Sequence, residues 1–230
     1  MCISFLSDGT VILYVGPYRK RIEIHKKLLS SISPELNKHV NNYMREGIEG
    51  KIHLPEEGAE ALTFFAEWAY TGDYDREDDT LEIPDEPWQI LHKHLQLCVF
   101  ADKFNIPTLR RLAESKFHSQ IRHCTVEPNC RSDVAGLVIV IGDACDNLPS
   151  SDPILKFLAQ YAAWKLELLR EATSFYDMVL DQPDFLKELF MNLSGPKTMP
   201  TAPQKHTPQV VHTPQAVYSY APQWGSTIGL

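Results

Sequence analysis

Hydrophobic and polar positions near the start of the chain follow the patterns of strands. Residues 10–16 ("TVILYVG") form an apolar, β-branched run that ends at Gly16-Pro17, which predicts a buried strand followed by a turn. Residues 21–24 then alternate polar and apolar, as in a strand with one exposed face. The two runs and the "GPYR" between them predict a hairpin, and "KIHL" (51–54) predicts a third short strand.

After the predicted hairpin, the apolar residues follow the spacing of helices. "HKKLLSSIS" predicts a short helix that ends at Ser33-Pro34. Ser33 as N-cap and Pro34 at the first helical position then open a second helix, which Gly47 can end in a left-handed conformation. The apolar residues at helical spacing on this second helix are Leu36, Val40, Tyr43 and Met44.

The next segments predict a helical core. Between Glu60 and Tyr70 one broad apolar stripe runs along a helix and consists of Ala61, Leu62, Phe65, Trp68 and Ala69. Residues 88–104 predict a helix that is apolar nearly all round between 95 and 101, so we expect it to be central. An amphipathic helix follows, with Leu109, Leu112, Ala113, Phe117 and Ile121 on its apolar face.

The rest of the chain divides into a helical part and a proline-rich tail. After a loop at 124–131, helical patterns recur at about 133–146, 153–170, 171–181 and 184–193. From Ser194 the chain is rich in Pro, Gln and Thr and has no acidic residue, which predicts disorder. Thr207 and Thr213 each precede a proline there and are candidate sites of proline-directed phosphorylation. The whole pattern predicts an α+β fold with a helical extension and a disordered tail.

Charge and cysteine content bear on the kind of partner and on the cellular compartment that the sequence predicts. The formal net charge of −8 disfavours general binding to nucleic acids, which requires a positive surface. The five basic residues between Arg19 and Lys27 fall on a turn and on the exposed side of a helix, so they are interpreted as a solvated face. No secretory signal and no apolar run of membrane-spanning length occur, and the five cysteines are irregularly spaced. These features predict an intracellular protein of the cytoplasm, the nucleus or both.

The sequence holds little that points to catalysis. It contains no GxxxxGK[ST], GxGxxG, GxSxG or HExxH motif. Cys124 and Cys130, with His118 and His123 nearby, do not have the spacing of a usual zinc site. We therefore predict that the protein is not an enzyme and that it needs no metal or cofactor.

Four stretches in order resemble the signature segments of a BTB/POZ domain. They are "SDGTVILYVG", "IHKKLLSSISPEL", "AEWAYTGDY" and "FADKFNIPTLRRLA". With the helical extension behind it, the arrangement is similar to that of many short fungal BTB proteins. The resemblance divides the chain into a BTB/POZ domain (1–122), a C-terminal helical extension (123–193) and the tail (194–230). It implies a three-stranded sheet with a helical cluster, and a role in protein–protein association.

Many members of this family are substrate adaptors of cullin ubiquitin ligases. Those members often carry a hydrophobic-x-Glu triplet after the helix that begins at Ser-Pro, and Met44-Arg45-Glu46 matches it. The resemblance thus implies a cullin site in which Glu46 accepts hydrogen bonds while Met44 and Tyr43 provide apolar contact. A scaffold or a transcription-associated module with no ligase role is the alternative. Only six residues precede Ser7, so a domain-swapped dimer is not expected, while other self-association stays open.

Overall fold

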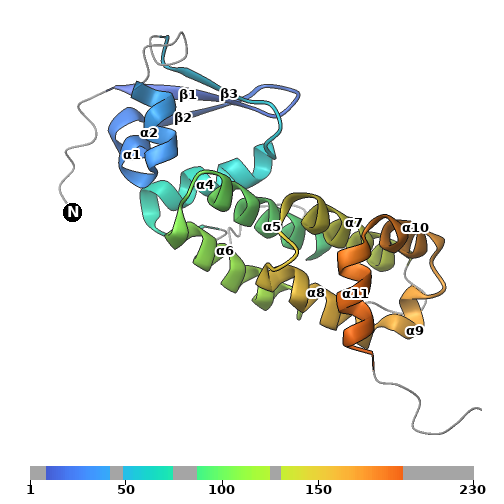
Figure 1. Cartoon of the computed structure of the whole chain (residues 1–230). Coiled ribbons are helices and arrows are strands. Elements are labelled where there is room, and N and C mark those ends of the chain that lie inside the picture. Colours follow the sequence, from blue (N-terminus) through green and yellow to red (C-terminus); the bar gives the residue numbers. More distant parts are fainter. Residues whose placement is uncertain (1–8, 42–48, 75–86, 125–130, 194–230) are drawn as a thin grey trace, which may run out of the picture. The chain divides into compact units, whose positions relative to one another are not determined.

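The computed structural model of this chain describes residues 9–41, 49–74, 87–124 and 131–193. All of them belong to one compact unit, which ends at Leu193. The described part has the α+β composition that the sequence predicts, with one three-stranded sheet and a majority of helical residues (Figure 1).

The sheet consists of β1 (Thr10–Val15), β2 (Lys20–His25) and β3 (Lys51–Leu54), in the order β2-β1-β3. The predicted hairpin is confirmed, because β1 and β2 pair antiparallel, whereas β3 pairs parallel to β1. Gly16 begins the hairpin turn with a φ of +70°. Its backbone N–H donates to Leu54 at 2.9 Å, so a left-handed residue in the turn also joins β1 to the end of β3.

The basic segment of the hairpin lies at the surface. Arg19, Lys20 and Arg21 are exposed, and Arg21 forms an ion pair of 2.8 Å with Glu23 of the same strand. Lys27 is exposed and Lys26 is half-buried at the start of the first helix. This placement agrees with the interpretation of the segment as a solvated face.

Two short helices follow the hairpin, α1 (Lys26–Ile32) and α2 (Pro34–Asn41). The predicted cap at Ser33 is confirmed: its hydroxyl oxygen accepts hydrogen bonds from the N–H groups of Glu35 and Leu36, both at 3.1 Å. Leu36 and Val40 are buried and hold α2 against the core. The predicted end of this helix at Gly47 lies outside the described residues.

The helices of the N-terminal half continue with α4 (Ala59–Thr71), α5 (Pro87–Lys103) and α6 (Pro107–Gln120). On α4 the predicted stripe is only partly buried, because Ala61, Leu62 and Phe65 are inaccessible while Trp68 and Ala69 keep some exposure. Gly72 ends α4 with a φ of +81° and donates its N–H to the carbonyl of Trp68 at 2.8 Å.

Helix α5 is central, as its apolar sequence predicts. It packs against α4, α6 and α7, and Figure 1 shows α5 and α6 running side by side. Its buried residues lie on several sides of the helix: Trp88, Leu91, His94, Leu95, Leu97, Cys98, Phe100 and Ala101. One hydrophobic cluster therefore extends from the sheet through α5 into the C-terminal helices.

The C-terminal helices are α7 (Arg131–Asn147), α8 (Pro153–Trp164), α9 (Leu166–Leu169), α10 (Thr173–Asp181) and α11 (Pro183–Met191). One helix was expected over 153–170, but the structure breaks it at Lys165, whose backbone (φ −95°, ψ 10°) leaves the helical region. The break lets Leu169 be buried, and Lys165 stacks over the Trp164 ring at 4.1 Å. Leu166 and Leu169 continue the helical spacing, so the pattern of apolar residues hides the break.

Candidate interaction surface

The residues that the sequence singled out for binding are not placed by the structure. Tyr43, Met44 and Glu46 fall between α2 and β3, in the range 42–48, which lies outside the described residues. The candidate phosphorylation sites Thr207 and Thr213 lie outside them as well. The candidate surfaces that the structure does describe are formed by other residues, above all those of the C-terminal helices.

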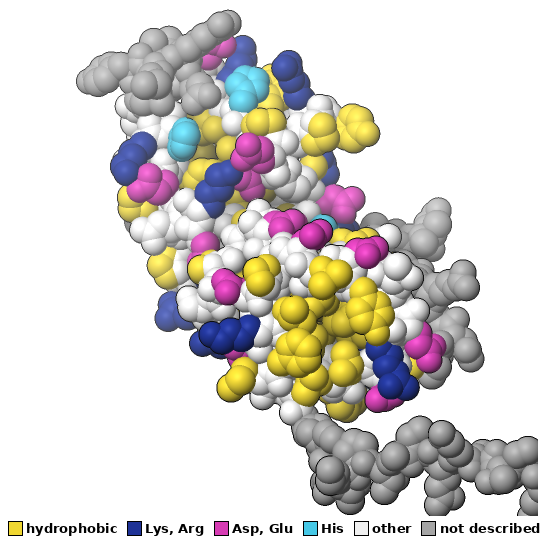
Figure 2. Space-filling view, turned by 45° about the vertical axis from the view of Figure 1, so that its right-hand side comes forward, with side chains coloured by type: hydrophobic (Ala, Val, Ile, Leu, Met, Phe, Trp, Pro, Cys, Tyr) yellow, Lys and Arg dark blue, Asp and Glu magenta, His cyan; other side chains and the backbone are white. Residues whose placement is uncertain are grey.

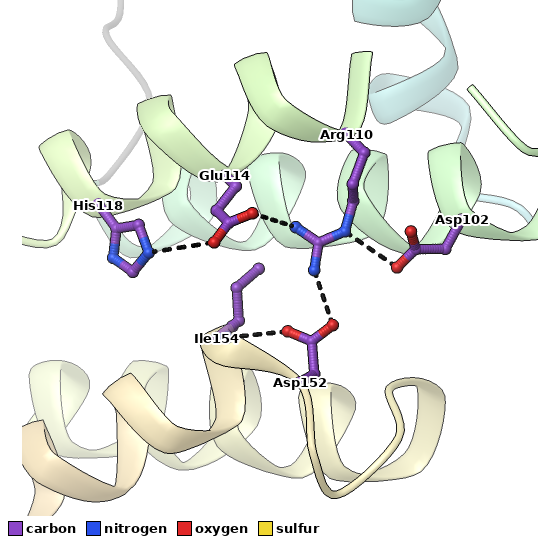
Figure 3. Close-up of polar contacts among 6 residues, drawn as sticks. All are labelled: Asp102, Arg110, Glu114, His118, Asp152 and Ile154. Carbon is purple, nitrogen blue, oxygen red and sulfur yellow. Dashed lines mark hydrogen bonds and ion pairs between the residues drawn. The ribbon is translucent and has the colours of Figure 1, made fainter. Parts of the chain in front are cut away.

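An ion-pair network joins these helices to the N-terminal half (Figure 3). The guanidinium of Arg110 on α6 donates to Asp102 at 2.9 Å, to Glu114 at 3.2 Å and to Asp152 at 2.8 Å. Arg110 and Asp152 are almost fully buried, with side-chain exposures of 11% and 8%. Three carboxylates around one cation leave the network negatively charged. The N–H groups of the planar Arg110 guanidinium bind acceptors on three different elements.

Asp152 has a second role in this network. It is the N-cap of α8, where its other carboxylate oxygen accepts the N–H of Ile154 at 2.8 Å (Figure 3). The same side chain thus starts α8 and binds Arg110 of α6. We interpret the network as structural, because its charged groups are used to fix the helical extension on α6.

A second buried polar contact involves a histidine of α5. His94 is 2% exposed, and its Nδ1 is 3.1 Å from the hydroxyl of the fully buried Tyr74. Burial lowers the pKa of His94 to about 4, with Lys116 and Lys93 lowering it further. Lys116 also lies 4.5 Å above the Tyr74 ring and pairs with Asp73 at 2.9 Å. The imidazole is therefore neutral near pH 7 and holds residues 73–74 against α5 and α6.

The described cysteines are poor nucleophiles. Burial raises the pKa of Cys98, Cys124 and Cys145 to about 12, so the thiolate is scarce at neutral pH. Within the described ranges no three His, Cys, Asp or Glu side chains lie close enough to hold a metal ion. Over the same ranges, no helix has the length and apolar character needed to cross a bilayer.

Large apolar side chains gather at the surface of the C-terminal helices. Figure 2 shows a patch of hydrophobic side chains on this part of the molecule. Tyr176 and Leu180 are one turn apart on α10, each next in the chain to one of its buried residues, Phe175 and Val179, and Phe190 and Met191 end α11. These four side chains, and Trp164 at the end of α8, are each at least half exposed. Apolar side chains grouped in this way mark surfaces that other proteins cover.

A groove lies where the end of α7, the α7–α8 loop and α11 meet. Its volume is about 250 Å³. Leu148, Leu155 and Phe185 form an apolar floor, and the side chains of Asp184 and Glu188 stand at its rim. Gln182 donates to Asp146 of α7 at 2.9 Å and so fixes the start of α11 against α7.

A second groove, of about 410 Å³, runs along α5 and α7 and is rich in carboxylates. Several of these carboxylates already have partners, since Glu57 pairs with Lys103 at 2.8 Å and Asp143 with His92 at 2.9 Å. Asp146 belongs to this groove and is held by Gln182 of the first one. The surface on both sides of the end of α7 is therefore acidic.

Sequence reasoning did not find the first groove. Nor did it find the exposed apolar surface, although "PDFLKELFM" of α11 carries a signal for that surface: Phe190 and Met191 add apolar residues outside the buried positions Phe185 and Leu189. Comparison of the chain with protein-family models and with curated proteins gave no significant match. The resemblance to BTB/POZ domains therefore stays a prediction from sequence motifs.

Proposed function

We propose that this protein is a non-catalytic protein–protein interaction module that acts as a substrate adaptor of a cullin-type ubiquitin ligase, with a BTB/POZ domain at its N-terminus. The apolar surface of the C-terminal helices carries the interaction role. Exposed aromatic and aliphatic side chains at helix ends favour contact with another protein, because burying each of them removes apolar area from water.

The BTB/POZ part of the proposal gains support from contacts between its signature stretches. His25, of the second stretch, meets Tyr70 of the third: the Tyr70 hydroxyl accepts the His25 backbone N–H at 3.0 Å and lies 2.7 Å from Nδ1. Ser33, again of the second stretch, donates its hydroxyl to the carbonyl of Phe104 in the fourth. Residues that were chosen by resemblance alone thus contact one another across the fold. A shared structural role would explain why they occur together.

The cullin part rests on the triplet at Met44-Arg45-Glu46. If Glu46 accepts hydrogen bonds from a cullin, Glu46→Lys removes an acceptor and places a cation against the partner's donors. Loss of a charged hydrogen bond at an interface typically costs about 2–5 kcal/mol, which weakens affinity by tenfold or more. The melting temperature should stay nearly unchanged, because surface substitutions usually alter stability by less than about 0.5 kcal/mol.

The test is isothermal titration calorimetry of a cullin N-terminal domain into the wild-type chain and the Glu46→Lys variant. Glu171→Lys is the matched control, since it makes the same charge change at an exposed position after α9. It should bind like the wild type. No wild-type binding at tens of micromolar would refute the adaptor role and leave the scaffold as the function. Equal binding by both variants would retain the adaptor and remove Glu46 from its site.

A further inference from the structure

The groove beside α11 has the size of an anchor site for one side chain. Its volume of about 250 Å³ is below the roughly 300–1,000 Å³ typical of sites that enclose a whole small molecule. Leu148, Leu155 and Phe185 on its floor are almost fully buried and belong to the main hydrophobic cluster. An apolar side chain that entered the groove would extend this cluster.

Two carboxylates stand at the rim of the groove. Asp184 and Glu188 lie one turn apart on α11 and both face the groove. The described part of the chain provides neither carboxylate with an ion pair or a hydrogen-bond donor. Elsewhere in this region carboxylates are paired, as Asp143 is with His92. As far as the described residues go, the groove therefore offers two carboxylates without a cation or donor beside an apolar floor.

An occupant that matches both features has an apolar side chain with a cation next to it. The surroundings favour the same chemistry, because the formal net charge of the chain is −8 and a second acidic groove lies on the other side of α7. Exposed Met191 stands on the same side of α11 as Asp184 and Glu188, so it can contact the residues that flank an anchor.

We propose that this groove binds a peptide segment of a partner protein in which an aliphatic or aromatic side chain is flanked by Lys or Arg. The apolar side chain enters between Leu148, Leu155 and Phe185, and the flanking cations pair with Asp184 and Glu188. The proposal rests on the interaction role proposed above but not on cullin binding. It assigns to the helical extension the recognition of a substrate or partner.

The probe is an array of fluorescein-labelled nonapeptides with a Gly/Ser background, read by fluorescence polarisation with the full-length chain. The central residue is Leu, Phe or Ser, and both of its neighbours are Lys, Glu or Ser. We expect binding to be strongest for Leu or Phe between two lysines. Replacing the central residue by Ser, or the lysines by Glu, should weaken binding at least tenfold.

Charge reversal gives the sharpest comparison. The double variant Asp184→Lys/Glu188→Lys should lose the preference for Lys-flanked peptides and gain one for Glu-flanked peptides. Asp177→Lys/Asp181→Lys is the matched control, because it makes the same change at two exposed positions one turn apart on α10, outside the groove. This control should keep the wild-type preference.

A variant that fills the groove tests its shape. Ser150 is exposed and lines the groove, so Ser150→Trp should block the anchor without disturbing the core and should abolish binding of every peptide. Three outcomes would overturn the proposal: no peptide binds up to 1 mM, both double variants change preference alike, or Ser150→Trp binds like the wild type. Cullin affinity, measured on the same variants, should not change, which separates this result from a failure of the adaptor role.

Discussion

Single side chains with two partners decide how the helical extension is attached. Asp152 binds Arg110 of α6 and caps α8 at the same time, so its replacement removes two different interactions. Breaking a buried ion pair from one side is costly because the remaining charge loses a partner inside the protein. In this network Arg110 still keeps Asp102 and Glu114, which limits the cost.

We expect Asp152→Ala to lower the free energy of unfolding by about 3 kcal/mol, from the lost cap and the weakened ion pair. Asp152→Ser restores a cap without the charge, so it should lose about 1 kcal/mol less. Urea denaturation followed by circular dichroism measures both. Equal stability of the two variants would mean that the cap contributes nothing, and wild-type stability in both would show that the network is not stabilising.

His94 makes the stability of the protein depend on pH. Its pKa is lowered to about 4 by burial and by the nearby lysines, against about 6.5 in an unfolded chain. Below pH 6.5 the unfolded chain binds a proton that the folded protein refuses, so stability falls as the pH drops and levels off near pH 4. Above pH 6.5 both states have a neutral imidazole and the contribution is constant.

The expected result is that the wild type loses about 3 kcal/mol relative to His94→Gln between pH 7 and pH 4. Glutamine keeps a hydrogen-bonding group near Tyr74 and cannot be protonated. Denaturation curves of both proteins at a series of pH values give the difference. His53→Gln, the same exchange at an exposed position, keeps His94 and should lose stability between pH 7 and pH 4 as the wild type does. If the stability difference between the two proteins stays constant with pH, His94 has the same pKa in the folded and unfolded states, and this prediction is wrong.

At the scale of elements, close packing of α7 on α5 depends on a glycine. A Cβ atom at Gly136 would lie 2.6 Å from Cγ of Trp88 and 2.8 Å from its Cβ. The Trp88 ring cannot move freely, because it is buried and its Nε1 donates to Asp133 at 3.3 Å. The two helices can approach at this point only where one of them lacks a side chain.

Gly136→Ala should therefore reduce the free energy of unfolding by about 1–3 kcal/mol, the usual cost of overpacking. Gly142→Ala in the same helix is the control, because the nearest atom to its added Cβ is 3.8 Å away. It should be neutral or stabilising by up to about 1 kcal/mol through helix propensity. Thermal unfolding of the wild type and of the two alanine variants measures both effects. If both alanines stabilise α7 equally, the contact with Trp88 does not restrict the packing.

Elements could be predicted from the sequence where one pattern dominates. The β1–β2 hairpin, the cap at Ser33 and the central α5 follow from local runs of residues, and each is confirmed. The break at Lys165 could not be predicted, because Leu169 continues the apolar spacing across it. Nor could the Arg110–Asp152 contact, since charged residues on polar helix faces give no sign of a distant partner. The groove at Asp184 and Glu188 likewise arises only when α7, α8 and α11 come together.

For the whole molecule, the question is whether the predicted domain 1–122 is stable without the extension. Helix α5 is the central helix, and part of its surface is covered by α7, whose Gly136 accommodates Trp88. The ring of Phe157 on α8 also contacts that of His118 on α6, with the ring centroids 4.5 Å apart. Removing 123–193 would expose these apolar surfaces and deprive Arg110 of Asp152.

We therefore expect residues 1–122 alone to lose the cooperative thermal transition and to aggregate or bind a hydrophobic dye. Residues 1–193 are the control: the tail that they lack is rich in proline and has no acidic residue, a composition that contributes little to a core. Their melting temperature should lie within about 2 °C of that of the full chain. Differential scanning calorimetry of the three chains measures this directly.

A cooperative transition of 1–122 near the melting temperature of the full chain would show two independent domains. The exposed surface of the extension could then move relative to the N-terminal half. If 1–122 fails to fold, any partner held by α10 and α11 is fixed relative to the sheet and to α1, α2 and α4–α6, which is the property an adaptor needs to present one protein to another.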